Sequence, residues 1–346
     1  MSERREFFSA RRIGLVGSHR GDAGLFSVFC QQIGRNLAAR QDLIVAIAGR
    51  MSGKHADDPA VRRRLERYVT GDSQFTTGFL EVIPEQDIGD RIETYVFARE
   101  SNDARFRHLG RVIQVEGRTR EARRFSMIHA VDGLIAVSGT GGTDQQITFA
   151  LATQTPVLPV PCFGNRAAQH WDNNEDDLAA QMGLTRQDCK RWKTPPKTEE
   201  EAKALAEEML DRFLASLSKR CFVIMPFAED FDALNHGVID PAVQSFGDEP
   251  IHLGNRGEPG DVGEQIREGI DKADYIICVL DGLRPNVLFE LGMAQAKGKP
   301  TILLWSEKRQ EAESVPFDIA HEQRINYGAV DDALLSRLQK AIGHVR

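Results

Sequence analysis

The sequence predicts an α/β fold made of two Rossmann-like or flavodoxin-like three-layer domains, each built on a parallel sheet. Short β-branched runs alternate with helical patterns along the chain, which is typical of parallel strands covered by helices on both faces. A polar, charged stretch from 173 to 217 interrupts this alternation, which then resumes at Cys221. At 346 residues, the chain is long enough for two domains with cores of their own.

We assign residues 1–172 to the first domain and 173–218 to a helical linker. An amphipathic pattern from Leu25 to about Arg40 predicts a helix, and Thr198 with Glu201 three residues later predicts a capping box at the start of another. The strands predicted in the first domain are Ile13–Ser18, Val45–Gly49, Phe79–Pro84, Arg111–Gly117, Gly133–Gly139 and Pro156–Pro161.

The second domain, residues 219–346, repeats the alternation of strands and helices. We predict strands at Cys221–Phe227, at the PIHL segment, at Tyr275–Gly282 and at Thr301–Trp305. We predict helices around 231–246, over 262–272, from near Asn286 and over 331–344. The unit is about 125 residues long, within the ordinary size of a compact domain.

Composition narrows the classes of protein. With 41% hydrophobic and 27% charged residues, the chain resembles a soluble globular protein, and no apolar run is long enough to span a bilayer. The net charge of -7 argues against binding to long nucleic acids, since phosphate contacts need a basic face. Five scattered cysteines without a C-x-x-C pair indicate neither a disulfide framework nor a metal site, so we expect a cytoplasmic protein without a metal.

A glycine-rich turn between a strand and a helix, Ser138–Thr143, predicts a phosphate site in the first domain. Glycine lets the backbone approach a ligand closely, and a helix N-terminus attracts an anion. The alternative is a tight connection with no ligand, and a solvated basic face would equally explain the arginines. The residues we expect to hold a nucleotide are Gly17, Ser18, Arg20, Arg123, Arg124, Gly139, Thr140, Gly141, Gly142 and Thr143.

Residues 10–165 resemble the SLOG superfamily, which includes the LOG phosphoribohydrolases and the Smf/DprA proteins. The LOG motif P-G-G-x-G-T-x-x-E is similar to Ser138–Gln146, and the upstream R-K-x-x-M to Arg123–Met127. Gln146 stands where the LOG family has its catalytic glutamate, and an amide cannot carry the required negative charge. The resemblance, strongest to the branch that associates with Sir2 and TIR effectors, therefore implies a binder of signalling nucleotides such as cyclic ADP-ribose isomers.

Glu290 is a carboxylate inside an otherwise apolar helical segment that follows a buried strand. An ionised carboxylate beside a ribose C1′ can stabilise oxocarbenium character or attack the carbon, as in sugar hydrolysis. From periodicity alone, a helix glutamate pointing into solvent remains an equal alternative.

The segment from VLDG through N-V-L-F-E-L-G-x-A resembles the nucleoside 2-deoxyribosyltransferases and the TIR-like domains of bacterial defence effectors, over residues 219–330. The resemblance implies that Glu290 is catalytic and that Phe227, Arg256 and Asn286 line the pocket, to which we add Asp281 at the strand end. Where transferases have an aspartate six residues before the glutamate, this chain has Arg284. A cation there suits a phosphate-bearing substrate, which favours NAD.

Together the two resemblances imply a sensor joined to an effector. The first hypothesis is an NAD⁺ glycohydrolase of antiphage defence, of the Thoeris or cyclic-nucleotide-signalling type, with NAD as its substrate and no metal. It would be activated by a small signalling nucleotide and would work as a homo-oligomer, away from membranes. The alternatives are a nucleoside or nucleotide N-glycosidase or 2-deoxyribosyltransferase, and a non-catalytic nucleotide-sensing scaffold.

Overall fold

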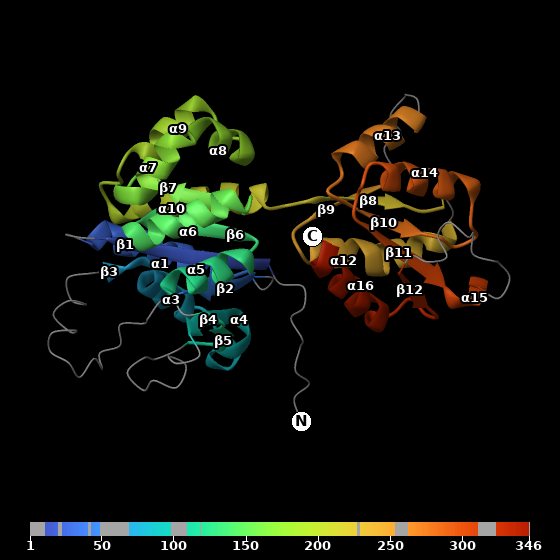
Figure 1. Cartoon of the computed structure of the whole chain (residues 1–346), viewed down its shortest axis with the longest axis horizontal. Coiled ribbons are helices and arrows are strands. Elements are labelled where there is room, and N and C mark those ends of the chain that lie inside the picture. Colours follow the sequence, from blue (N-terminus) through green and yellow to red (C-terminus); the bar gives the residue numbers. More distant parts are fainter. Residues whose placement is uncertain are drawn as a thin grey trace. The chain divides into compact units, whose positions relative to one another are not determined.

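The computed structural model describes residues 11–19, 23–40, 43–48, 69–97, 109–117, 119–226, 229–252, 262–310 and 323–345. The chain divides into two compact α/β units, Arg11–Leu217 and Ser218–Arg346, called here the N-terminal and C-terminal units (Figure 1). Among the described residues, no helix combines the length and the apolar character needed to cross a membrane. Each unit has its own sheet and its own core.

The sheet of the N-terminal unit has strand order β5-β4-β2-β1-β6-β7. Strand β1 (Arg11–His19) lies parallel to β2 (Leu43–Ile47) on one side and to β6 (Gly133–Ser138) on the other. The remaining parallel strands are β4 (Ile92–Phe97), β5 (Arg111–Val115) and β7 (Val157–Val160). From β1 the chain adds β2, β4 and β5 on one side of the sheet, and then β6 and β7 on the other. The carboxyl ends of β1 and β6 therefore border the crevice where open α/β sheets bind ligands.

Helices cover both faces of this sheet (Figure 1). One layer contains α1 (Gly24–Ala38), which packs against α3 (Gly71–Leu80) and α10 (Glu199–Ser216). The other contains α6 (Gly141–Ala152), which packs against α5 (Arg120–His129) and α7 (Asn165–Asn173). The short β3 (Val69–Thr70) runs antiparallel to the end of β1 and leads directly into α3.

The strand predicted at Phe79–Pro84 is wrong. Phe75 and Phe79 are fully buried one turn apart on α3, which is the helical spacing of a packed face. A Cβ added at Gly78 would lie 1.9 Å from the carbonyl oxygen of Gln31 on α1, so glycine permits the close helix contact. After α3 the chain passes through η1 (Glu85–Asp87) and α4 (Ile88–Arg91) into β4, a strand that the sequence analysis missed.

The polar segment that follows β7 is helical. After α7 it forms α8 (Glu175–Met182), α9 (Arg186–Lys193) and α10, and the buried side chains of α10 belong to the core of the N-terminal unit. The Thr198 hydroxyl accepts the Glu201 N–H at 3.2 Å, as expected for an N-cap. The Glu201 carboxylate accepts the N–H of Lys197 instead of Thr198, so the predicted reciprocal capping box does not form.

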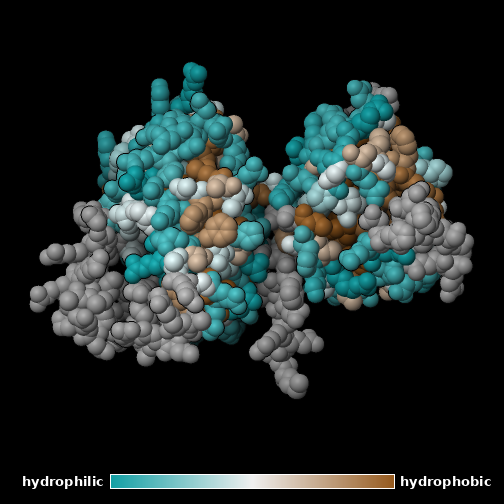
Figure 2. All heavy atoms as spheres, viewed as in Figure 1, coloured by the Kyte–Doolittle hydropathy of each residue, from teal (hydrophilic) through white to brown (hydrophobic). Residues whose placement is uncertain are grey.

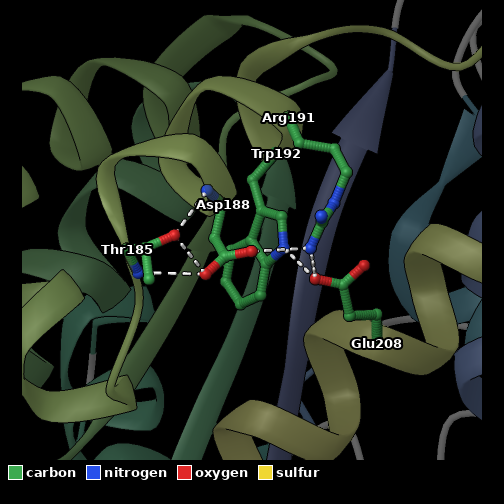
Figure 3. A network of polar contacts seen from close by, with 5 residues as sticks. All are labelled: Thr185, Asp188, Arg191, Trp192 and Glu208. Atoms are coloured by element: carbon green, nitrogen blue, oxygen red, sulfur yellow. Dashed lines mark hydrogen bonds and ion pairs between the residues drawn. The ribbon is translucent and has the colours of Figure 1, made fainter.

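A polar network fastens α9 to α10 (Figure 3). Thr185 and Asp188 form a capping box at the start of α9. Arg191 and the buried indole Nε1 of Trp192 both bind the Glu208 carboxylate on α10, the indole at 2.9 Å. A cavity of about 390 Å³ lies beside this network, lined by Pro195, Pro196, Leu205 and neighbouring residues, and it contains no residue of the predicted sites.

The C-terminal unit has strand order β12-β11-β10-β8-β9, with all neighbours parallel. The strands are β8 (Arg220–Ile224), β9 (Glu249–His252), β10 (Tyr275–Val279), β11 (Thr301–Ser306) and β12 (Arg324–Tyr327). Order reverses between β8 and β10, so a second ligand crevice is expected at their carboxyl ends. The sequence analysis missed β12.

Alternate residues of β8 and β10 face two separate cores. One face packs against η3 (Asn235–Ile239), α12 (Asp240–Gln244) and α16 (Asp332–Val345), and the other against α13 (Val262–Lys272) and α14 (Pro285–Ala296). The chain also forms η2 (Glu229–Phe231), α11 (Asp232–Leu234) and α15 (Glu307–Gln310). Three layers of helix, sheet and helix therefore make up this unit, as predicted.

The visible surface of each unit is mostly hydrophilic, with smaller apolar areas (Figure 2). Phe289, on α14, is 68% exposed, more than the other large apolar side chains noted as exposed in the described part of the chain. It directly precedes Glu290 in sequence, but the Phe289 side chain points into solvent while that of Glu290 is buried.

Candidate functional site

Glu290 occupies the second turn of α14. This helix follows the central strand β10, so it begins near the carboxyl ends of the strands of the C-terminal sheet. It is 8% exposed and makes no hydrogen bond or ion pair with another described residue. Burial raises the pKa of its carboxyl group above the ordinary value, because removal from water disfavours the charged form. Glu290 is thus largely buried, and none of the described residues pairs with its carboxylate.

Two other predicted residues of this site, Arg284 and Asn286, lie in the turn before α14 and in its first helical turn. Gly282 and Leu283 have φ values of +79° and +37°, a region that is uncommon for leucine. Arg284 is the exposed N-cap of α14 and Asn286 is exposed in its first turn. Asn286 precedes Glu290 by four residues and lies on the same side of the helix. Phe227 and Arg256 lie outside the described residues.

Asp281 is 3% exposed and its two oxygens have different partners. Oδ1 accepts the Ser306 N–H at 2.6 Å, and Oδ2 accepts the hydroxyl of Tyr327. Ser306 ends β11 and Tyr327 ends β12. Asp281 therefore fastens three strand ends together, and its carboxylate is engaged by the protein itself.

A second polar cluster in this unit escaped the sequence analysis. Asp240, at the start of α12, accepts from His252 Nε2 at 2.7 Å and contacts His236 Nδ1 at 3.0 Å. His252 is the last residue of β9, so the cluster joins the end of an edge strand to the helix layer. The four-residue spacing of His236 and Asp240 was a readable signal, whereas the position of His252 depends on the fold. No group of three metal-ligating side chains was found among the described residues.

In the N-terminal unit the ends of β1 and β6 lie side by side, with Gly17 opposite Val137 and Ser18 opposite Ser138. The Gly139 N–H donates to the Ser18 carbonyl oxygen at 2.8 Å. A Cβ at Gly17 would lie 2.3 Å from the Val137 carbonyl oxygen, so only glycine fits there. The structure therefore brings together two of the predicted turns. Arg20 lies outside the described residues.

The glycine turn leads into α6 with Thr140 at the N-cap position, where its side chain makes no capping hydrogen bond. Gly139 has φ +88°, and a Cβ there would lie 2.2 Å from Thr143 Oγ1, so the turn packs closely against the helix. Gly141 and Gly142 form the first turn without side chains. Such a helix start presents backbone N–H groups to an anion.

Arg124 lies against this helix start. Its guanidinium group bonds Gln145, and a Cβ added at Gly142 would lie 2.7 Å from its Nη2 atom. Arg123, by contrast, is 9% exposed and its guanidinium group lies 5.3 Å from the ring centre of Phe97. Of the two predicted arginines, Arg124 is the one beside the glycine turn.

Gln146 is the sixth residue of α6, as Glu290 is the sixth residue of α14. Its side chain is buried, with 6% exposure, and Nε2 has no hydrogen-bond partner. It shares the sheet-facing side of the helix with Thr143 and Ile147, which are also buried. A buried amide donor without a partner is unusual in native structures, and either ordered water or a ligand can supply the acceptor.

Asp72 is a residue of this crevice that the sequence analysis missed. It lies in the first turn of α3, and its carboxyl group accepts hydrogen bonds from its own N–H and from the N–H of Gly17. Burial raises the pKa of Asp72 from 3.8 to about 7, although these hydrogen bonds and the charge of Arg123 act in the opposite direction. The T-G-D-S sequence at 70–73 predicts the start of a helix, but it does not predict that Asp72 lies near Gly17.

Comparisons with known proteins give remote structural likenesses. No family model and no curated protein matches the chain. TM1055, a structural genomics target, is 17% identical over 57% of this chain and 99% of its own, with a TM-score of 0.36. The CMP N-glycosidase BcmB of Clostridium botulinum is 22% identical over 34% of this chain and 97% of its own, with a TM-score of 0.28.

The molybdenum cofactor binding protein of Rippkaea orientalis is 15% identical over 58% of this chain and 98% of its own, with a TM-score of 0.34. What the chain does must therefore be inferred from its two α/β units and from the geometry of their crevices.

Proposed function

We propose that the chain is an N-glycosidic bond hydrolase that acts on NAD⁺, with Glu290 as its catalytic carboxylate. The observation that carries the proposal is the burial of Glu290 at the carboxyl edge of the β8–β10 sheet without a partner among the described residues. A carboxylate in this state has no structural task that would account for the cost of its desolvation.

The chemistry follows from charge. As the bond between nicotinamide and ribose breaks, positive charge develops at C1′ and the ring oxygen, and an ionised Glu290 stabilises it or forms a bond to C1′. Water then supplies the hydroxyl group that remains on the sugar. We assign the binding of ribose hydroxyls to Asn286, which lies one turn before Glu290 on α14, and the binding of the substrate pyrophosphate to the exposed Arg284.

The N-terminal unit is proposed to bind a small signalling nucleotide and thereby control the C-terminal unit. Its crevice offers an uncapped helix start, Arg124 and an unpartnered buried amide, but Gln146 stands where a carboxylate would be needed for hydrolysis. This division of binding and catalysis is compatible with a homo-oligomeric effector of antiphage defence, which plaque counts of cells carrying wild-type or Glu290→Gln protein would test.

The direct test uses the purified full-length chain. It is incubated separately with NAD⁺, deoxyinosine and dCMP, with and without ADP-ribose-type nucleotides, and base release is followed by chromatography. We expect nicotinamide release from NAD⁺, with Glu290→Gln lowering the rate by at least about 100-fold. The matched control is Glu268→Gln, because Glu268 is exposed on α13, where it pairs with Lys272 of the same helix.

The alternatives give different results. Cleavage of dCMP or deoxyinosine with NAD⁺ untouched under every activator identifies a nucleoside or nucleotide N-glycosidase or transferase instead. Equal defence by wild-type and Glu290→Gln cells supports the non-catalytic scaffold and contradicts the role of Glu290.

A further inference from the structure

Two helix N-termini meet at the β1–β6 crevice. Helix α6 follows the end of β6. Gly139, between the two, donates its N–H to the carbonyl oxygen of Ser18. Helix α3 begins at Gly71, where an added Cβ would lie 3.1 Å from the Cα of Gly17. Thr70, its N-cap, pairs with Ser18 across β3 and β1. Both helices therefore start beside the same two strand ends.

The two helix starts differ in charge. At α3, the backbone N–H groups of Asp72 and Gly17 already favour the charged form of the Asp72 carboxyl group, so the chain supplies its own negative charge there. At α6, the first turn consists of Gly141 and Gly142, and the Thr140 side chain does not cap it. A ligand phosphate is repelled by Asp72 and attracted to α6. We therefore expect the α6 N-terminus to contribute more than Gly17 to holding a phosphate.

An ionised carboxylate only accepts hydrogen bonds and has about four lone-pair sites, more than the N–H groups of Asp72 and Gly17 can fill. The remaining capacity suits ligand groups that donate, and in a nucleoside phosphate these are the sugar hydroxyls. The buried Nε2 of Gln146, which has no partner, is a donor one turn further along α6 and suits an oxygen of the same ligand.

We propose that Asp72 is a specificity-determining residue that accepts hydrogen bonds from ribose hydroxyls, while the α6 N-terminus holds the phosphate of the same nucleotide. The crevice would thereby select ribonucleotides over deoxy analogues and over free pyrophosphate. This inference rests on the proposed binding of a nucleotide by the N-terminal unit, and it assigns recognition of the ribose to Asp72.

The test measures binding to the full-length chain by calorimetry at about pH 8.5, above the pKa of Asp72 (about 7). The probes are AMP, 2′,3′-dideoxy-AMP, ADP-ribose and pyrophosphate. Wild-type protein should bind AMP on the order of 10- to 100-fold more tightly than the dideoxy analogue, as expected for hydrogen bonds to a charged acceptor. This comparison needs no variant and is independent of any folding defect.

Asp72→Asn should remove the preference for AMP and weaken ADP-ribose, while pyrophosphate binds equally or more tightly because a negative charge is gone. The matched control Asp176→Asn changes an exposed aspartate in the first turn of α8 and should change nothing. If AMP and dideoxy-AMP bind wild type equally, or if Asp72→Asn weakens AMP and pyrophosphate alike, Asp72 does not read the sugar, although the crevice still binds nucleotides. If no probe binds wild type, the proposed sensing role fails as well.

Discussion

Positions 146 and 290 carry different side chains at corresponding places in the two units. Each is the sixth residue of the helix that follows the strand beside the reversal of strand order. The amide at 146 is neutral at every pH, whereas the carboxyl group at 290 is charged or neutral according to its pKa. In the proposed function, this difference of one functional group separates the crevice that binds a nucleotide from the crevice that cleaves a bond.

The pH dependence of catalysis follows from Glu290. Burial raises its pKa above the ordinary glutamate value, and the proposed chemistry needs the ionised form. The rate of nicotinamide release should therefore fall on acidification at a higher pH than an exposed glutamate would give. Initial rates at saturating NAD⁺ from pH 4 to 8 check this. An acid limb at the ordinary glutamate value, or none, contradicts a desolvated catalytic carboxylate.

Asp72 should make stability depend on pH. Its folded-state pKa is raised from 3.8 to about 7, so the stability linked to its neutral form is fully present below about pH 4 and is lost as pH rises through 7. Each pKa unit corresponds to about 1.4 kcal/mol of unfolding free energy. Urea denaturation should show wild type losing stability relative to Asp72→Asn over this range. Parallel curves would contradict it.

The two residues also show what sequence patterns reveal. Glu290 stood out because a carboxylate interrupts an apolar helix face, and that contrast is local in the chain. Asp72 acts through Gly17, which is far from it in sequence, and their contact exists only because β3 returns α3 to the end of β1. Arg123, predicted as part of a ligand site, lies largely buried near Phe97, and its charge acts on Asp72 of the crevice. Its role in binding stays a prediction.

At the scale of elements, the long periodic helices and the buried central strands were predicted well. A helix packed on one face shows a 3.6-residue apolar period, and a strand covered on both faces is a continuous apolar run. The Phe79–Pro84 segment was misread because a short apolar run fits either a strand or the end of a helix. Only the spacing back to Phe75, together with the close contact at Gly78, identifies it as α3. Strands β4 and β12 were missed.

The attachment of α9 to α10 provides a prediction at this scale. Glu208→Ala removes the acceptor of the buried Trp192 indole and a partner of Arg191 (Figure 3). Loss of a partner for a buried donor costs about 1–3 kcal/mol, so the unfolding free energy should fall by that amount. Urea denaturation followed by tryptophan fluorescence measures it. The control is the exposed neighbour Glu207→Ala, and an equal loss in both variants would contradict the role of the network.

The whole molecule consists of two units with cores of their own. In the N-terminal unit, residues from β1 through α10 form one continuous apolar cluster, which is long enough to be stable alone. We therefore expect that helices α8 to α10 fold with the N-terminal unit and not as an independent connection.

A fragment spanning residues 11–217 should accordingly fold in isolation. Its far-UV circular dichroism should show helix and strand, and its urea transition should be cooperative and coincide with one transition of the full chain. A fragment that ends at 172 lacks the buried face of α10 and should unfold at lower urea concentration. A non-cooperative transition for 11–217 would contradict this division of the chain.

The anchoring of Asp281 has a consequence for natural variation at the C-terminal crevice. Tyr327 holds a carboxylate that immediately precedes the turn into α14, yet it lies 46 positions away in sequence from Asp281. Tyr327→Phe would remove the hydrogen bond to one oxygen of Asp281. The turn into α14, the helix that carries Glu290, would then be held less rigidly, although no residue predicted to line the crevice is changed. For the proposed site, we therefore expect a substitution on the edge strand β12 to change substrate preference at a distance from Glu290.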